Sequence, residues 1–492
     1  MRHIIHIALA ALLIATSLES SAQGTTQWRD IHKVKRHETV FGIARNYNIT
    51  IDELLNANPE MREKGYELKK GAVIFIPYSK DDAQSSTATG KTLPAKTTAA
   101  TDKSSARSAA KTAPQSAAKP AAHRLSTIRI GIMLPFLDHS SEGTRMVEYY
   151  RGVRAALDSL SKEGIKTEIN LWNINKDSVV TSVLAHNPAI AKQNIIFGPL
   201  YTSQVRPLAD FCRKNAIKLV MPFSVSADDV TTNPYVYQIY QDDAALSGRS
   251  IGAFIERFAQ GYRPIFVNTN TPSDGKYTFT KALREVLEGK GIKPEITNLN
   301  TPLGDFAKHF SSTTANVIVL NSGAYKPLER LCAKLDSLKK EYPSLRISTY
   351  GYNEWFIYQP NLESYFFKYN VHIPTTYYFS RTSDRVENFE HEYKARYGQG
   401  MNPDCLPRMA LLGFDHTMFF VRGISKYGTD FNGIAKQDTG YKPMQSRLIF
   451  KREGKGGYQN SIFQIIRFKT DGTMDSLTYG VEGGRLTMVK YI

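Results

Sequence analysis

Cysteine is scarce in this chain of 492 residues, which contains only Cys212, Cys332 and Cys405. Three thiols allow at most one internal disulfide, and the sequence leaves open which pair, if any, is joined. Their separations match neither a zinc ribbon nor a redox CxxC motif, so we expect no metal site and no thiol chemistry. Because none of the three lies near the N-terminus, we also expect no lipid anchor on an N-terminal cysteine.

The chain also lacks the motifs that mark common hydrolases and nucleotide-binding enzymes. His391 and Glu392 begin an H-E-x-x pattern, but Ala395 stands where the second zinc-binding histidine would be. There is no G-x-S-x-G nucleophile elbow, and Gly275-Lys276 lacks the upstream glycine of a phosphate-binding loop. These absences predict a protein that is not an enzyme and that uses no cofactor.

No apolar run is long enough to span a bilayer comfortably. The longest, from Ile4 to Leu18, follows a short basic start and precedes the small residues Ser20, Ser21 and Ala22. This order is typical of a cleaved secretory signal, so residues 1–22 are predicted to be a signal peptide cut after Ala22. We therefore expect a secreted or periplasmic protein with no transmembrane segment in the mature chain.

Acidic residues are fewer than basic ones, and the formal net charge is +17. The basic residues are spread along the chain, and no recognition helix or aromatic RNA-binding motif accompanies them. Nucleic acid is therefore not an expected partner. For an exported protein, anionic glycans or membrane surfaces are better counterparts of this charge.

Residues 79–125 contain no Phe, Trp or Tyr, and the chain becomes apolar again only near Leu125. This Ala/Ser/Thr/Lys-rich stretch cannot bury enough apolar surface to offset its conformational entropy, so we predict a disordered linker that acts as a tether. It separates a small module at residues 28–78 from a large domain at residues 126–492.

The small module shows a β-α-α-β pattern. His32 to Lys35 alternates like a strand, and a helical stripe begins at Val40. Thr50 followed by Glu53 forms a capping box for a second helix, and Val73 to Ile76 reads as the closing strand.

The stretches "VKRHETVFGIARNYNI", "IDELLNANP" and "LKKGAVIFIP" resemble the LysM family of glycan-binding modules. The resemblance implies binding of peptidoglycan or another N-acetylglucosamine polymer in a shallow groove between two loops. His37 replaces the glycine that usually opens the first of these loops. The implied groove residues are Glu38, Thr39, Val40, Phe41, Asn58, Pro59 and Glu60. Capping of the helices by Thr39 and Asn58 is an alternative role for those two residues.

The large domain alternates apolar strands with amphipathic helices, which predicts an α/β fold of two lobes, each a doubly wound parallel sheet. The predicted strands are Thr127 to Phe136, Glu168 to Trp172, Asn194 to Phe197, Lys218 to Pro222, Pro264 to Asn268, Asn316 to Leu320 and Arg346 to Gly351. The predicted helices include Met146 to Leu160, Tyr201 to Lys214, Ala244 to Phe258, Tyr277 to Leu287 and Tyr325 to Lys339. Strand segments after Gly440, with a turn at Asp471-Gly472, are expected to pack on this domain.

The ordered stretches "IRIGIMLPF", "IIFGPLYTSQVRPLADF", "VIVLNSGAYKPLERL" and "STYGYNEW" resemble the type I periplasmic-binding-protein fold, in its branched-chain amino acid receptor branch. The resemblance implies a small-ligand cleft lined by Thr202, Ser203, Ser224, Ser226, Tyr325 and Glu354. Asp274-Gly275 stands where the family has an aromatic residue and a glycine, which puts amino acid specificity in question. Helix capping is the alternative role for the hydroxyl groups.

Together these features predict a secreted envelope protein that binds peptidoglycan and presents a two-lobed domain to a ligand or partner. By analogy with penicillin-binding-protein activators, that partner would be a wall-synthesis protein, and the role would be regulatory. One alternative is a solute receptor for an amino acid or wall peptide. A second is a cell-wall hydrolase with an unrecognised site.

Overall fold

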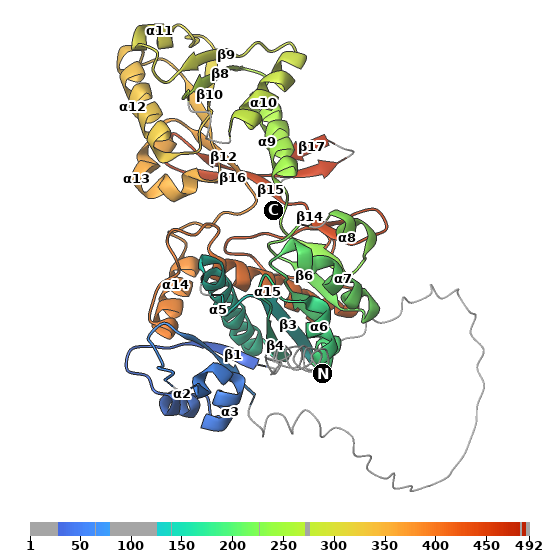
Figure 1. The fold of residues 1–492 in the computed structure, drawn as a ribbon. Coiled ribbons are helices and arrows are strands. Elements are labelled where there is room, and N and C mark those ends of the chain that lie inside the picture. The colour runs from blue at the N-terminus through green and yellow to red at the C-terminus, as the bar shows by residue number, and fades with distance from the viewer. Residues whose placement is uncertain are drawn as a thin grey trace, which may run out of the picture.

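The computed structural model describes residues 28–63, 65–78, 125–138, 140–225, 227–270, 276–482 and 485–488 of the chain (Figure 1). The predicted signal peptide and all of the predicted linker except Leu125 lie outside these residues. The described residues form a small N-terminal module and two α/β lobes, one above the other in Figure 1. No helix among the described residues is long and apolar enough to cross a membrane.

The module has the β-α-α-β order that the sequence predicts. The first helix is capped by the Thr39 hydroxyl, and the second carries the complete Thr50/Glu53 capping box. The inner stripes of both helices, including Ile43 and Leu54, pack with Ile74 in a small core. Its elements are β1 (Trp28–Lys33), α2 (Val40–Asn46), α3 (Ile51–Ala57), the 3-10 helix η1 (Pro59–Arg62) and β2 (Val73–Pro77).

The first lobe is built on a sheet whose strand order is β13-β14-β7-β6-β5-β3-β4-β1-β2. Strands β3 to β7 are parallel, as predicted from the apolar runs that two-sided burial requires. The strands of the lobe are β3 (Ile128–Leu134), β4 (Thr167–Asn173), β5 (Ile195–Phe197), β6 (Lys218–Met221), β7 (Val236–Gln238), β13 (Phe450–Arg452) and β14 (Tyr458–Asn460). The helices of the lobe are α5 (Ser141–Lys162), α6 (Val180–His186), α7 (Val205–Lys214), α8 (Ala227–Thr232), α14 (Asp384–Tyr397) and α15 (Met409–Tyr427). The 3-10 helices are η2 (Pro188–Lys192), η3 (Thr202–Gln204) and η5 (Gly428–Asp430).

The second lobe has a sheet of order β17-β16-β15-β12-β11-β10-β8-β9, in which β8 to β12 are parallel. Its strands are β8 (Tyr262–Asn268), β9 (Glu295–Asn298), β10 (Ala315–Leu320), β11 (Ile347–Tyr350), β12 (Val371–Thr375), β15 (Phe463–Phe468), β16 (Met474–Glu482) and β17 (Arg485–Met488). Its helices are α9 (Asp243–Phe258), α10 (Tyr277–Gly289), α11 (Leu303–Ala307), α12 (Tyr325–Glu341) and α13 (Trp355–Lys368). Two parallel-dominated sheets confirm the predicted α/β class.

The chain passes three times between the lobes, after β7, after β12 and between β14 and β15. The strands after Gly440 therefore do not stay together. The pair β13 and β14 completes the first sheet, whereas β15 to β17 form the antiparallel edge of the second. The predicted turn at Asp471-Gly472 joins β15 to β16, and Gly472 has the positive φ of 80° that such a turn favours.

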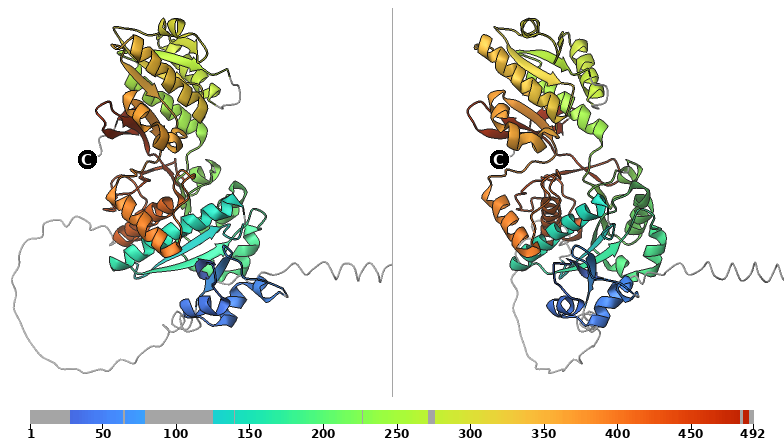
Figure 2. Two further views of the ribbon diagram at one scale, coloured as in Figure 1. Left: turned by 90° about the vertical axis from the view of Figure 1, so that its left-hand side faces the viewer. Right: turned by 60° about the vertical axis from the view of Figure 1, so that its left-hand side comes forward.

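The module packs against the first lobe of the large domain. In all three views it lies against the first lobe (Figures 1 and 2). Strand β1 pairs with β4 through Trp28 and Leu171, so the sheet of the first lobe continues into the module. Ile31 and Phe75 of the module belong to the same buried cluster as Tyr150 of the lobe. Burial of this shared apolar surface favours the docked arrangement.

Candidate functional sites: the module groove, its docking face and the second-lobe pocket

The first loop of the module groove is held by short polar contacts. Glu38 Oε2 accepts a hydrogen bond from the Lys35 amide at 2.6 Å and lies 2.7 Å from His32 Nε2. Burial raises the pKa of Glu38, but the hydrogen bonds and the nearby positive charges lower it more, so the pKa lies below its usual value. Thr39 caps α2 by accepting from the Gly42 amide at 3.1 Å. The Glu38 carboxylate therefore stabilises the loop through internal contacts and is not free to bind a sugar.

Phe41 is the most exposed of the groove residues with an apolar side chain. Its relative exposure is 63%, and Ile51 on the neighbouring helix is 41% exposed. Val40 is half-buried against the module core. An aromatic ring held on a short capped helix and left open to water provides a flat apolar face for a sugar ring.

The second loop begins at Asn58, whose side chain is only 1% exposed. Its amide donates to the carbonyls of Leu54 and Phe75, both at 2.8 Å, and its Oδ1 accepts from the Phe75 amide at 2.7 Å. The side chain thus joins the end of α3 to β2, and its amide nitrogen and oxygen are both engaged by backbone groups. Pro59 and Glu60, which follow it in η1, are exposed.

His37 has a φ of 65°, in the left-handed region. The sequence places it where related modules carry glycine, the residue that adopts this conformation at least cost. Histidine tolerates the left-handed region better than most non-glycine residues. The loop therefore keeps the glycine-type backbone although the residue has changed.

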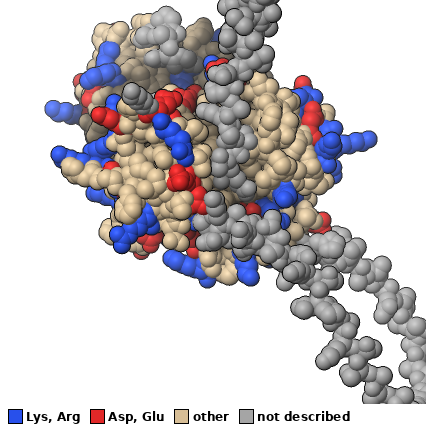
Figure 3. Space-filling view, turned by 60° about the horizontal axis from the view of Figure 1, so that its bottom comes forward, with Lys and Arg blue, Asp and Glu red and all other residues tan. Residues whose placement is uncertain are grey.

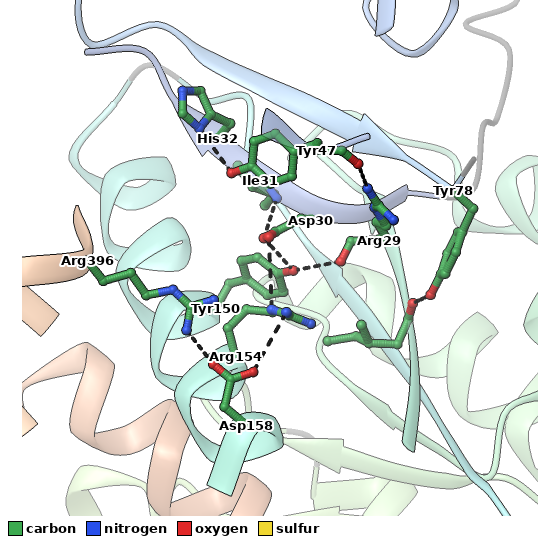
Figure 4. Close-up of polar contacts among 11 residues, drawn as sticks. Arg29, Asp30, Ile31, His32, Tyr47, Tyr78, Tyr150, Arg154, Asp158 and Arg396 are labelled. Carbon is green, nitrogen blue, oxygen red and sulfur yellow. Dashed lines mark hydrogen bonds and ion pairs between the residues drawn. The ribbon is translucent and has the colours of Figure 1, made fainter. Parts of the chain in front are cut away.

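The module docks on α5 of the first lobe through a cluster around Asp30 (Figure 4). The Tyr150 hydroxyl lies 3.0 Å from Asp30 Oδ1 and 3.1 Å from the carbonyl of Arg29. Arg154 Nε lies 4.0 Å from Asp30 Oδ2, and Arg154 also pairs with Asp158 on the same helix. Burial and the Asp30 carboxylate raise the pKa of Tyr150 well above its usual value, so it remains a protonated donor.

The docking face and the groove loop share residues. His32 lies between them, with Nδ1 3.0 Å from the Tyr47 hydroxyl and Nε2 beside Glu38. The Arg29 guanidinium donates to the carbonyl of Tyr47, as Figure 4 shows. The same strand therefore supports the groove on one side and the lobe on the other.

Reversing the charge at Asp30 should release the module. If residues 79–125 carry a protease site and are cut, the module should co-elute with the lobes in the otherwise unchanged protein. Asp30→Arg would place a second guanidinium against Arg154 and leave the Tyr150 hydroxyl only the Arg29 carbonyl of its two acceptors, so we expect at least tenfold weaker association. Size-exclusion chromatography of the cut protein measures this.

The control for that experiment is Asp52→Arg, because the Asp52 side chain is 85% exposed on the module. It makes the same charge change away from α5 and should leave the pieces together. Separation of the cut but otherwise unaltered protein, or co-elution of the cut Asp30→Arg protein, would contradict the docked arrangement.

Charged side chains are mixed on the face of the molecule shown in Figure 3, where Lys and Arg lie among Asp and Glu. No single basic patch dominates the part of that face that the described residues form. A phosphate backbone favours a continuous basic surface, and this face does not present one.

A cavity of about 720 Å³ lies in the second lobe, between the N-terminal turns of α9 and α10, the residues that follow β11 and the last two residues of β12. It opens where parallel strands end, the usual place for ligands in such sheets. It is lined by Asp243, Ala244, Leu246, Ser247, Gly248, Ser250, Ile251, Lys276, Thr278, Phe279, Ala282, Tyr352, Asn353, Glu354, Pro374, Thr375 and Phe463.

Of the residues predicted for the small-ligand cleft, only Glu354 lines this cavity. Thr202 and Ser203 are exposed in η3 of the first lobe. Ser224 is buried and donates to the carbonyl of Pro199 at 3.1 Å, which is a structural role. The Tyr325 hydroxyl donates to Glu329 Oε1 of its own helix at 3.0 Å. Ser226 and the Asp274-Gly275 pair lie outside the described residues.

Lys276 is the charged partner of Glu354 in this cavity and was not among the predicted cleft residues. Its Nζ lies 2.5 Å from Glu354 Oε1 and 4.7 Å from the centre of the Tyr352 ring. Because Glu354 is 78 positions away from Lys276, no short sequence motif contains both residues of the pair. The only available signal was its position just after a predicted strand and at the start of a predicted helix.

Several buried titratable groups are held in their uncharged forms. Burial lowers the pKa of His372 and of His416 to about 3 each, so both rings are neutral at neutral pH. Burial raises the pKa of the Cys212 thiol, and the three cysteines are free. Among the described residues no group of three or more His, Cys, Asp and Glu side chains could hold a metal ion.

Comparisons with known proteins give one family match and a set of similar structures. The model of the LysM domain family matches residues 32–77. The comparison with curated proteins gives no match. One similar structure is an ABC transporter substrate-binding protein from Desulfitobacterium hafniense in complex with Leu. It has 15% identity, the match covers 71% of this chain and 100% of that chain, and the TM-score is 0.37.

Two other similar structures are described as branched-chain amino acid transporter proteins. The one from Rhodospirillum rubrum has 14% identity, covers 74% of this chain and 100% of its own, and has a TM-score of 0.44. The one from Streptococcus pneumoniae, in complex with isoleucine, has 14% identity, covers 72% of this chain and 99% of its own, and has a TM-score of 0.37.

Proposed function

We propose that this chain, whose N-terminal module is a LysM domain, is a secreted, non-enzymatic envelope protein that binds peptidoglycan or another N-acetylglucosamine polymer. The two-lobed domain would then recognise a second ligand or a wall-synthesis protein. The observation that carries the proposal is the open groove: Phe41, Pro59 and Glu60 stay exposed although the module is docked on the first lobe.

The chemistry of the groove supports a glycan more than a charged ligand. Its carboxylate at Glu38 is already engaged by Lys35 and His32, whereas the Glu60 carboxylate and the Phe41 ring are exposed and could meet the hydroxyl groups and the apolar face of a sugar. Acetamido groups hydrogen-bond to backbone amides, and the apolar face of a sugar packs on an aromatic ring. Docking on α5 would hold a bound glycan strand at a defined side of the first lobe.

Phe41→Ala should weaken binding of the full chain to insoluble peptidoglycan by about tenfold, because a contact of ~1.4 kcal/mol is lost at a ring that supports no core. Co-sedimentation over a range of peptidoglycan concentrations measures the effect. Tyr277→Ala is the control, since this aromatic side chain is 56% exposed in the second lobe and should not contribute. Failure of the unaltered chain to sediment would refute the proposal.

A solute-receptor role is the second candidate, and the second-lobe cavity of about 720 Å³ is the observation that favours it. That volume suits a small molecule of amino acid or short peptide size. Thermal unfolding with candidate ligands tests it, because saturation at 100 times the dissociation constant adds ~2.7 kcal/mol of stability. Release of soluble fragments from peptidoglycan by the purified chain would instead indicate a hydrolase.

A further inference from the structure

The ion pair between Lys276 and Glu354 is built into the wall of the second-lobe cavity. Lys276 Nζ lies 2.5 Å from Glu354 Oε1, and the same ammonium group lies over the Tyr352 ring. The Tyr352 hydroxyl holds that ring in place by donating to the Leu320 carbonyl at 2.6 Å. Gly323 makes room for the pair. A Cβ at that position would come within 3.1 Å of Lys276 Cε and 3.5 Å of Glu354 Cδ.

The pair changes what the cavity attracts. Glu354 is a carboxylate that would otherwise hold a cationic ligand, but the chain itself supplies the cation. A ligand ammonium would have to displace Lys276 and leave it without its carboxylate partner. The other carboxylate of the cavity, Asp243, is exposed in the first turn of α9, where water and the helix N-terminus stabilise its charge.

Asn353 in the wall of the same cavity carries an unpaired neutral acceptor. Oδ1 of Asn353 is buried and has no hydrogen-bond partner among the described residues. Leaving such an acceptor without a donor is costly, and an N–H or O–H group of a ligand would satisfy it. Apolar side chains, including Leu246, Phe279 and Phe463, form the remaining walls.

We propose that this cavity binds an uncharged amide-bearing small molecule, and that Lys276 is the specificity-determining residue that excludes ligands with a free ammonium group. The inference rests on the proposed ligand-recognition role of the two-lobed domain. It is independent of glycan binding by the module, which the peptidoglycan experiment tests separately.

Three probes that share one side chain and differ in charge test the proposal: N-acetyl-L-leucinamide, L-leucinamide and L-leucine. Calorimetric titration of the full chain should show the uncharged probe binding at least tenfold more tightly than either ammonium-bearing probe. Preference for L-leucine or L-leucinamide would overturn the proposal, and so would no binding of N-acetyl-L-leucinamide at 50 mM, roughly the weakest affinity that such a cavity would give.

Lys276→Met keeps the length of the side chain but removes its charge, so it frees Glu354. We expect this variant to reverse the preference and bind L-leucinamide at least tenfold more tightly than N-acetyl-L-leucinamide. The double variant Lys276→Met with Glu354→Gln should lose that gain. An unchanged preference in Lys276→Met, in a protein whose thermal unfolding shows that it is folded, would overturn the role of Lys276.

Discussion

Asp415→Asn should lower the free energy of unfolding of the first lobe by about 3–5 kcal/mol. The Asp415 side chain is fully buried in α15 and accepts four hydrogen bonds. Oδ1 accepts from the Tyr441 hydroxyl at 2.5 Å and the Met444 amide at 2.9 Å. Oδ2 accepts from the amides of Gln445 and Ser446, both at 2.7 Å. An asparagine NH₂ in place of Oδ2 would face two backbone N–H donors and satisfy neither. In place of Oδ1 it would face the Met444 N–H, and the Tyr441 hydroxyl would have to turn from donor to acceptor.

Urea unfolding with hydrogen exchange of the segment 441–446 measures the effect, because that segment should exchange faster when its anchor is lost. Asp438→Asn is the matched control. Asp438 is exposed in the same connection, and its carboxylate accepts from the Gly440 amide at 2.8 Å, a bond that an asparagine Oδ1 would also accept. Equal effects of the two changes would show that Asp415 is not the anchor.

Gly152→Ala should destabilise the first lobe by about 3 kcal/mol, at the upper end of the usual cost of overpacking. Helices α5 and α15 cross backbone against backbone at this position. A Cβ at Gly152 would lie 1.8 Å from the carbonyl oxygen of Ala410, and one at Gly413 would lie 2.0 Å from that of Tyr149. The obstacle is backbone, so the helices must move apart and open the buried contact between them.

Gly289→Ala is the control for this prediction. Gly289 ends α10, and a Cβ there would meet nothing within 4 Å. Alanine should therefore raise stability by up to about 1 kcal/mol through helix propensity alone. Hydrogen exchange of peptides from α5 and α15 reports on the first lobe directly. Normal protection of both helices in Gly152→Ala would contradict the close crossing.

Much of the fold could be predicted because it is written in short-range patterns. The capping box at Thr50 and the apolar run at Ile128–Leu134 lead directly to α3 and β3. The resemblance to LysM is confirmed by the family match at residues 32–77, inside the predicted module. Residues close together in the chain decide these elements, so a short stretch of the sequence is enough to predict each of them.

Other elements gave no such signal. Helix α15 is buried on nearly every side, so it has no polar face and no clear helical stripe. Strands β7 and β14 have three residues each, too few for a periodic pattern. The predicted cleft stays a prediction, although the hydroxyl groups of Ser224 and Tyr325 have partners within the protein.

The sequence by itself determined the order of the parts, the β-α-α-β module and the alternation that builds two parallel sheets. Tertiary structure alone decided that the module docks on α5 through Asp30 and Tyr150, 120 positions apart, and that Lys276 neutralises Glu354, 78 positions away. The physical reason is the range of the interactions. Periodicity and capping act over a few residues, whereas docking and charge pairing arise only when folding brings distant side chains together.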